Sequence, residues 1–233
     1  YHAAAFLSQE DGAKITSVIE RDGSIVDNKG IDIKALHTHM KETGGVSGFK
    51  GFTNKSKEIL ERQCDILIPA ALESVINLSN ANKIKTKLIV EAANGPITFE
   101  ADDLLRRKGI TIIPDLYANA GGVTVSYFEW VKNLTHMRFG RMQRRETEHR
   151  NSLLINSIEN ITGKEFSKNV RSKITEGPKE IDLVRSGLDD TMREAYIVIS
   201  SKRKSDPRII DLRTAAMIIA LEKITQSYLS SGL

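Results

Sequence analysis

The sequence has very little cysteine and no long apolar run. Cys64 is the only cysteine, so no disulfide can form within the chain, and a reducing compartment fits it best. No stretch approaches the roughly 20 apolar residues that a transmembrane helix requires, so we expect no membrane span. Residues 1–5 carry no basic segment followed by an apolar one, so we expect no signal peptide there. Because the sequence does not begin with Met, we expect any targeting segment to lie upstream.

Metal ligands and a strong excess of one charge are also missing. His37 and His39 lie two residues apart without a third ligand, so we interpret them as surface histidines. The net charge is +4 over 233 residues, which is only a weak indication of acidic partners. Residues 138–150 contain five arginines, but Glu146 and Glu148 lie among them. This mixture favours a solvated helix face over a nucleic-acid surface.

The first half of the chain indicates a soluble α/β domain. Hydrophobic residues make up 40% of the chain and charged residues 27%, which is typical of a globular protein with its own core. Strands are predicted at residues 14–20, 64–69, 87–92 and 110–114, and helices at residues 1–10, 32–42, 54–62 and 98–108. This alternation predicts a parallel sheet with helical crossovers, which binds its ligands beyond the carboxyl ends of the strands.

Local signals mark the ends of several of these elements. Asp32 and Thr98 are predicted to cap the helices that follow them. The pair Asp22-Gly23 predicts a turn after the first strand, and the four glycines within residues 44–51 predict a loop.

The second half is predicted to be almost entirely helical. Its expected elements are a helix with an apolar face at Val123, Tyr127, Val131 and Leu134, helices at residues 146–162 and 181–200, and an irregular segment at residues 164–178. A last helix is predicted to start at Asp206-Pro207, with Asp206 as its cap and Pro207 in its first turn.

Small and polar side chains follow three of the predicted strands. Glu20 ends the first one, where a carboxylate can accept hydrogen bonds from both hydroxyls of an adenosine ribose; a solvated strand-end acid is the alternative. The fingerprint G-x-G-x-x-G that should precede such an acid is absent. Ala70 and Ala71 follow the next strand, and Ala93 and Asn94 the one after it. These residues would let a flat ring or a pyrophosphate approach the backbone, although ordinary turns have a similar composition.

The segment Asn119-Ala120-Gly121-Gly122 is the sharpest local feature. It follows the last strand and opens the helix that contains Ser126. Backbone N–H groups at such a helix start suit an anion or a carbonyl, and the hydroxyl of Ser126 would face the same space. A helix entry selected for tight packing is the alternative.

Several segments, in this order, resemble glutamate dehydrogenase of the hexameric animal type, within the Glu/Leu/Phe/Val dehydrogenase family. The resemblance runs along the whole chain and is weaker in the middle of the polar helical region. The segments are ERDGSI (20–25), CDILIPAA (64–71), EAANGP (91–96), IPDLYANAGGVTVSYFEW (113–130), DLVRSGL (182–188) and DLRTAA (211–216). The block at residues 113–130 is too long to match by chance.

The resemblance implies oxidation of L-glutamate to 2-oxoglutarate and ammonia, with hydride transfer to NAD or NADP. By position it implies that Glu20 binds the adenosine ribose. The nucleotide and nicotinamide path is implied to be lined by Ala70, Ala71, Ala93 and Asn94. Asn119 is implied to contact nicotinamide and substrate, and Val123 and Ser126 to face the substrate. The hydroxyl of Ser126 is implied to help hold the side-chain carboxylate of glutamate. Relatives that act on leucine or phenylalanine usually have an apolar residue there, and an unpaired carboxylate in a pocket is costly.

The sequence departs from the family in its catalytic half and at Arg21. In the family, the glycine fingerprint ends directly before the position of residue 1, and the catalytic lysine and aspartate lie further upstream. We therefore expect no catalytic residue in this chain, and no activity from the chain alone. Arg21 stands where animal relatives often have Ser. Beside Glu20 it would pair with a 2′-phosphate, so we expect NADP to be accepted alongside NAD.

The polar helical region resembles the antenna of the animal enzymes, a helical hairpin that stacks on neighbouring subunits of a homo-hexamer. It is short between residues 164 and 172. Arg185 replaces a histidine, and Ile197 stands where an arginine commonly contacts nucleotide effectors. The resemblance implies GTP and ADP as effectors, and these departures lead us to expect that inhibition by GTP and activation by ADP are both altered.

The predicted fold is an α/β, Rossmann-like parallel sheet that lacks its first strand and glycine turn, followed by an all-helical antenna-like region. The expected parts are a dinucleotide-binding domain (1–118), a connecting helix (119–137), antenna-like and pivot helices (138–204) and a C-terminal helix (205–233). The family implies the mitochondrial matrix, and we expect no bound metal, nucleic acid or membrane. The alternatives are a non-catalytic subunit that co-assembles with complete ones, a dehydrogenase of branched or aromatic amino acids, and, more distantly, a nucleic-acid binder.

Overall fold

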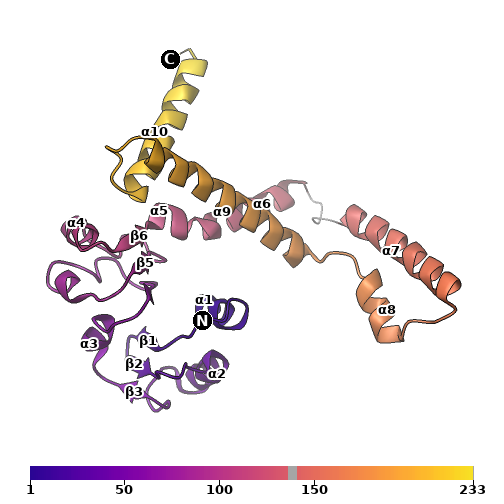
Figure 1. Cartoon of the computed structure of the whole chain (residues 1–233), viewed down its shortest axis with the longest axis horizontal. Coiled ribbons are helices and arrows are strands. Elements are labelled where there is room, and N and C mark those ends of the chain that lie inside the picture. The colour runs from indigo at the N-terminus through magenta and orange to yellow at the C-terminus, as the bar shows by residue number, and fades with distance from the viewer. Residues whose placement is uncertain (136–140, 233) are drawn as a thin grey trace. The chain divides into compact units, whose positions relative to one another are not determined.

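The computed structural model describes residues 1–135 and 141–232. The chain divides into two compact units, and Figure 1 labels their elements along the chain. The first unit consists of Tyr1–Ile68, Glu73–Ile89 and Pro96–Thr111, and the second of Pro69–Leu72, Val90–Gly95 and the described residues from Ile112 onward. The boundary predicted between residues 137 and 138 lies outside the described residues.

A small antiparallel sheet belongs to the first unit. Its strands β1 (Ser17–Glu20), β2 (Gly23–Val26) and β3 (Phe52–Thr53) are ordered β1-β2-β3. Glu20 lies opposite Gly23, so residues 21 and 22 form a two-residue hairpin turn. The prediction that the strand at residues 14–20 joins the parallel sheet is therefore wrong. The turn predicted at Asp22-Gly23 lies one residue earlier, at residues 21 and 22, and it folds the chain back on itself instead of leading away from the strand.

Helices α1 (His2–Gln9), α2 (Ile33–Thr43) and α3 (Ser56–Leu60) accompany this sheet. The carboxylate of Asp32 accepts a hydrogen bond from the Ala35 N–H at 2.9 Å, which confirms the predicted cap of α2. A core of buried apolar side chains, including Ile25, Leu36 and Val46, packs between these elements.

The second sheet confirms the predicted parallel pairing. Its strands β4 (Ile66–Leu67), β5 (Leu88–Val90) and β6 (Thr111–Ile113) are ordered β4-β5-β6, and β4 runs parallel to β5. The short helix η1 (Ala81–Lys83) precedes β5, and α4 (Phe99–Arg107) precedes β6. Thr98 caps α4 as predicted, because its hydroxyl accepts a hydrogen bond from the Ala101 N–H.

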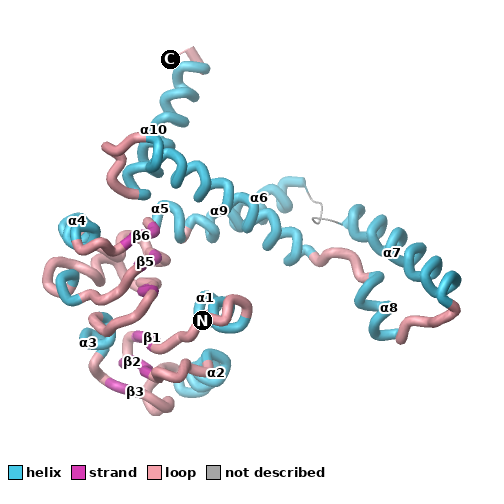
Figure 2. Tube along the Cα trace, in the orientation of Figure 1, coloured by secondary structure: helices cyan, strands magenta, loops and turns pink. Residues whose placement is uncertain are grey.

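From α5 onward the described chain is helix and loop, as Figure 2 shows. The helices are α5 (Asp115–Ala118), α6 (Ala120–Thr135), α7 (Arg141–Thr162), α8 (Lys168–Thr175), α9 (Glu180–Ser205) and α10 (Leu212–Ser230). Helix α9 packs against both α6 and α10. Helices α7 and α8 form a hairpin, in which Nδ2 of Asn151 donates to the Ile174 carbonyl at 2.9 Å and Arg171 pairs with Glu159.

Two sequence predictions fail in this helical part. The segment at residues 164–178 is not irregular throughout, because α8 lies within it and the hydroxyl of Ser167 caps its first turn. The last helix starts after Asp211, whose carboxylate accepts from the Thr214 N–H at 2.6 Å. Asp206 instead accepts from the Arg208 N–H and guanidinium, which closes a local turn at the end of α9.

Candidate functional site

Two predicted site residues from separate loops meet in the second unit. Asn94 lies in the loop after β5, and Asn119 is the residue at which α5 ends. Nδ2 of Asn119 donates to Oδ1 of Asn94 at 2.6 Å, and both residues are exposed or half-buried at the surface. Because each carboxamide has a donor and an acceptor side, the pair still offers Nδ2 of Asn94 and Oδ1 of Asn119 to a ligand.

The backbone beneath this amide pair is held by Asp115. Oδ2 of Asp115 accepts a hydrogen bond from the Gly95 N–H at 2.8 Å. Gly95 has a φ of +52°, a conformation that favours glycine, so the turn after Asn94 suits this residue. The Asn119 N–H donates to the Asp115 carbonyl at 3.2 Å. Both asparagines are thus positioned through one aspartate at the start of α5.

Asp115 belongs to a network of three charged residues. Nη1 of Arg213, on α10, donates to Oδ1 of Asp115 at 2.7 Å, and Nη2 of Arg213 pairs with Oε2 of Glu91. Glu91 is completely buried, and its Oε2 also accepts from the Asp115 N–H at 2.8 Å. Its other oxygen, Oε1, has no hydrogen-bond partner among the described residues.

The two carboxylates of this network differ in their electrostatics. Burial raises the pKa of Glu91, and the hydrogen bond from Asp115 and the charge of Arg213 only partly oppose this effect. Burial also acts to raise the pKa of Asp115. There, hydrogen bonds from the Gly95 N–H, the Arg213 guanidinium and the Leu116 N–H outweigh burial, and the pKa is lowered.

The small-residue loops after β4 and β5 lie against one another. The carbonyl of Pro69 accepts hydrogen bonds from the N–H groups of Ala92 and Ala93, both at 3.0 Å. Ala93 is buried, whereas Ala70 and Ala71 are exposed. Two of the loops that the sequence assigned to a nucleotide path are therefore adjacent.

The substrate-facing residues predicted on α6 are exposed. Val123 keeps 74% of its surface, and the hydroxyl of Ser126 donates to the Gly122 carbonyl at 3.0 Å. A side chain at Gly122 would meet no atom within 4 Å, and one at Gly121 would make an ordinary contact with Leu188 at 3.5 Å. Space alone therefore does not require glycine at either position, which weakens the tight-packing alternative.

Glu20 and Arg21 lie at the tip of the β1–β2 hairpin in the first unit, and both are exposed. The tip is held by Asp22, whose Oδ2 accepts from the N–H groups of Val46 and Ser47 at 2.8 and 3.0 Å. The hydrogen bond from Ser47 is the main cause of the lowered pKa of Asp22. These bonds present Glu20 and Arg21 to solvent in a defined conformation.

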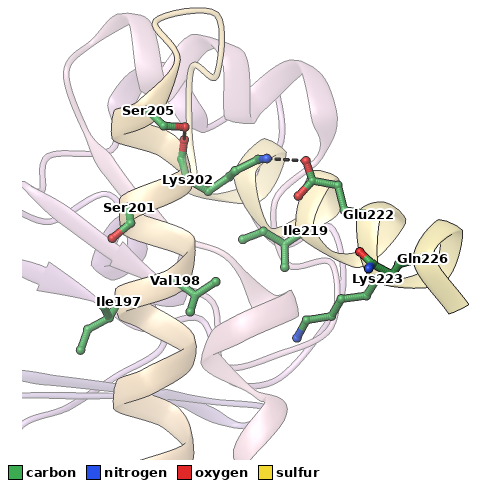
Figure 3. Close-up of a pocket in the computed structure, with 9 residues that line it drawn as sticks. All are labelled: Ile197, Val198, Ser201, Lys202, Ser205, Ile219, Glu222, Lys223 and Gln226. Carbon is green, nitrogen blue, oxygen red and sulfur yellow. Dashed lines mark hydrogen bonds and ion pairs between the residues drawn. The ribbon is translucent and has the colours of Figure 1, made fainter.

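Ile197 lines an open groove between α9 and α10, shown in Figure 3. Lys202 crosses from α9 to pair with Glu222 on α10, and the hydroxyl of Ser205 donates to the Lys202 carbonyl at 2.7 Å. Ile197 keeps 63% of its surface, so it adds apolar area to this groove.

The predicted surface histidines have ordinary packing roles. His37 stacks on the ring of Tyr1 at 3.7 Å, and Nε2 of His39 lies 2.8 Å from the Ser47 carbonyl. Among the described residues, no three His, Cys, Asp or Glu side chains form a group that could hold a metal ion. In the same part of the chain, no helix has both the length and the apolar character needed to cross a membrane.

Sequence reasoning did not single out Glu91, Asp115 or Arg213. Each lies in a segment that carries the family resemblance, but no local pattern connects residues so distant in the chain. One signal was present: Glu91 follows directly on the apolar strand at residues 88–90. An acid placed there needs a buried partner of opposite charge, which predicts an arginine or lysine from elsewhere in the fold.

Comparison with known proteins confirms that the resemblance covers nearly the whole chain. A probable glutamate dehydrogenase of Sinorhizobium fredii is 49% identical over 226 residues, which are 96% of this chain and 51% of that protein. The mitochondrial glutamate dehydrogenase of Dictyostelium discoideum is 46% identical and aligns with 100% of this chain and 46% of its own length. The NADP-specific glutamate dehydrogenase A1 of Halobacterium salinarum is 34% identical and aligns with 98% of this chain and 46% of its own length. The chain thus spans about half the length of the curated relatives it matches.

Solved structures share the fold. The hetero-hexameric glutamate dehydrogenase of Thermus thermophilus in its Leu-bound form superposes with a TM-score of 0.73 at 20% identity, over 98% of this chain and 44% of that one. The Plasmodium falciparum enzyme superposes with a TM-score of 0.68 at 18% identity, over 100% of this chain and 44% of that one. The sequence profile of one family matches residues 2–232. The chain therefore belongs to the Glutamate/Leucine/Phenylalanine/Valine dehydrogenase family.

Proposed function

We propose that the full-length protein containing this chain oxidises L-glutamate to 2-oxoglutarate and ammonia, with hydride transfer to NAD or NADP. Family membership and the names of the curated relatives support this reaction. The structural observation that carries the proposal is the hydrogen bond between Asn94 and Asn119, which brings two predicted cofactor and substrate contacts together.

The residues around this pair suit a nicotinamide cofactor. A nicotinamide carboxamide has one donor group and one acceptor oxygen, and Asn94 and Asn119 together offer the complementary acceptor and donor. The neighbouring residues Ala70, Ala71 and Ala93 are small, so a flat ring can approach the backbone. When bound, the nicotinamide supplies the hydride acceptor, and the role of these residues is to orient it towards the α-carbon of the substrate.

Ser126 and Val123 are proposed to face the substrate. For its hydroxyl to donate to the side-chain carboxylate of glutamate, Ser126 must release the hydrogen bond that it donates to the Gly122 carbonyl. The exchange replaces a neutral acceptor with a charged one, which forms the stronger hydrogen bond. This difference favours glutamate over substrates with apolar side chains.

Glu20 is proposed to bind the adenosine ribose, and Arg21 to pair with a 2′-phosphate when NADP is bound. Both side chains are exposed at a hairpin tip held by Asp22, so neither must break a buried contact to bind. The NADP-specific relative supports the use of NADP within the family. We propose that this protein accepts both cofactors.

We further propose that residues 1–118 bind the dinucleotide and that residues 119–137 connect to antenna-like and pivot helices at 138–204. The C-terminal part at 205–233 follows, and its helix is α10 (Leu212–Ser230). The α7–α8 hairpin exposes Leu154, with 56% of its surface, and Ile161, with 85%, which supports subunit contacts in a homo-hexamer. The mitochondrial relative supports a mitochondrial location. We propose that the response to the effectors GTP and ADP is altered, because Arg185 and Ile197 depart from the family pattern.

The test is glutamate-dependent reduction of NAD and of NADP by the full-length protein, with the 233-residue chain assayed in parallel. Activity in the full-length protein alone supports the proposal and places the chemistry in the other half. A preference for leucine or phenylalanine over glutamate would contradict it. Absence of activity in both samples would favour a non-catalytic subunit that co-assembles with complete ones.

A further inference from the structure

Arg213 joins the C-terminal helix to two backbone segments, one just before Asn94 and the other just before Asn119. Its guanidinium reaches Glu91, at the end of β5, and Asp115, at the start of α5, across 122 and 98 residues of sequence. One planar group with two parallel donors therefore sets the distance between two backbone segments. Glu91 adds a second link, because its carboxylate accepts the Asp115 N–H.

The links continue from Asp115 to the asparagines. One carboxylate oxygen of Asp115 accepts from Arg213, and the other accepts from the Gly95 N–H, one residue beyond Asn94. The carbonyl of Asp115 accepts the Asn119 N–H. Arg213 thus positions Asp115, and Asp115 positions the backbone of Asn94 and of Asn119.

A purely structural role is a poor explanation of this arrangement. Burying a carboxylate completely, as at Glu91, costs free energy that apolar packing would avoid, so a buried ion pair is weak evidence for stability. By contrast, small displacements of groups that orient a reacting ring cost large factors in rate. The network adjoins Asn94 and Asn119, so a displacement within it would move the groups proposed to orient the nicotinamide ring.

We propose that Arg213 is a positioning residue of the active site: through Asp115 it holds Asn94 and Asn119 at the spacing that orients the nicotinamide ring. Arg213 itself is proposed to contact neither cofactor nor substrate. The inference rests on the proposed function, because it assigns the amide pair to the cofactor and the substrate.

Two variants of the full-length protein test this role. Arg213→Lys keeps the positive charge but cannot bridge both carboxylates with a planar fork. Asp115→Asn keeps the size of the side chain but replaces one acceptor oxygen with a donor nitrogen. That nitrogen must face either Arg213 or the Gly95 N–H, so two hydrogen-bond donors oppose one another there and one link is lost. Arg208→Lys is the matched control, because Arg208 also pairs with an aspartate, in an exposed turn.

Three readouts separate positioning from folding. We expect both variants to lower kcat by roughly 10- to 100-fold, as misplacement of a reacting group does, while the Kd of NADH measured by its fluorescence changes far less. Hydrogen–deuterium exchange should become faster in peptides that cover residues 91–96 and 115–122. Arg208→Lys should change none of the three.

An unchanged kcat and unchanged exchange in a folded Arg213→Lys or Asp115→Asn variant would overturn the proposal. So would parallel losses of kcat, NADH binding and melting temperature, because these indicate a structural role. If Arg213→Lys fails to assemble, Asp115→Asn decides the question alone. If the wild-type protein proves inactive on glutamate, the proposed function fails, while hydrogen exchange still shows whether Arg213 controls the two segments.

Discussion

Asn119 donates its side-chain amide to the side-chain carbonyl of Asn94 at 2.6 Å, across 25 residues of sequence. The bond connects the loop after β5 to the end of α5. In open parallel sheets, loops at the carboxyl ends of neighbouring strands converge on the ligand. The sequence predicts both residues in such loops, and the structure shows that their side chains are hydrogen-bonded to one another.

The two asparagines are expected to act as a unit. Asn94→Ala and Asn119→Ala should each lower kcat/KM for glutamate by roughly tenfold or more, since a hydrogen bond and an alignment are lost. The double variant should lose little more than either single one, because the second change removes a partner that is already missing. Asn151→Ala, which removes a hydrogen bond within the α7–α8 hairpin, is the control. Additive losses would show that the asparagines act independently.

Arg21 is expected to set the response to NADP. Arg21→Ser should raise the KM for NADP by roughly tenfold, the size of a lost charge-assisted hydrogen bond, and leave the KM for NAD nearly unchanged. Steady-state kinetics with each cofactor at saturating glutamate measure both values. Equal KM values for NADP before and after the substitution would remove Arg21 from the cofactor site.

Ser126 is expected to discriminate between substrates. Ser126→Ala should lower kcat/KM for glutamate by roughly tenfold, because the side-chain carboxylate loses a donor in the pocket. Ser157→Ala is a matched control: its hydroxyl also donates to a carbonyl four residues back, but on α7. The outcome against this role is a loss in Ser126→Ala no larger than that in Ser157→Ala.

Glu91 is expected to make stability depend on pH with a sign opposite to that of Asp115, whose pKa is lowered in the folded state. The pKa of Glu91 is raised in the folded state by burial, so the folded state binds more protons than the unfolded one above the ordinary value of 4.5. The contribution of Glu91 to stability therefore falls as pH rises through that range. Glu91→Gln does not titrate, so its melting temperature should improve relative to wild type as pH increases. A constant difference, or one that moves the other way, would contradict a raised pKa.

Elements with local signals were predictable from the sequence. Thr98 and Asp32 accept the N–H groups that their capping roles require, and β4 pairs with β5 in parallel. The start of α10 was placed too early because Asp206-Pro207 and Asp211 both have the composition of a helix start. Their hydrogen bonds distinguish them: Asp211 accepts from the Thr214 N–H and caps α10, whereas Asp206 accepts from Arg208, two residues on.

Single residues of the candidate site were predictable from the sequence, but the contacts that hold them in place were not. The loops of Asn94 and Asn119 were identified from strand ends and small residues, and the roles came from the family resemblance. The network that positions them was not predictable, because Arg213 meets Asp115 through tertiary packing of α10, which no local periodicity encodes. The antiparallel pairing of β1 with β2 was not predicted for a related reason. A turn signal in the sequence does not determine which strand the following residues pair with.

The most direct measurement follows the hydrogen at the α-carbon of the substrate. The full-length protein would be supplied with L-glutamate deuterated at C2 and with NAD or NADP, and the reduced cofactor examined by mass spectrometry. The deuterium is expected to appear in the reduced nicotinamide as 2-oxoglutarate forms, and Asn119→Ala is expected to slow its transfer. Reduced cofactor without deuterium, or no glutamate-dependent reduction at all, would contradict the proposed function.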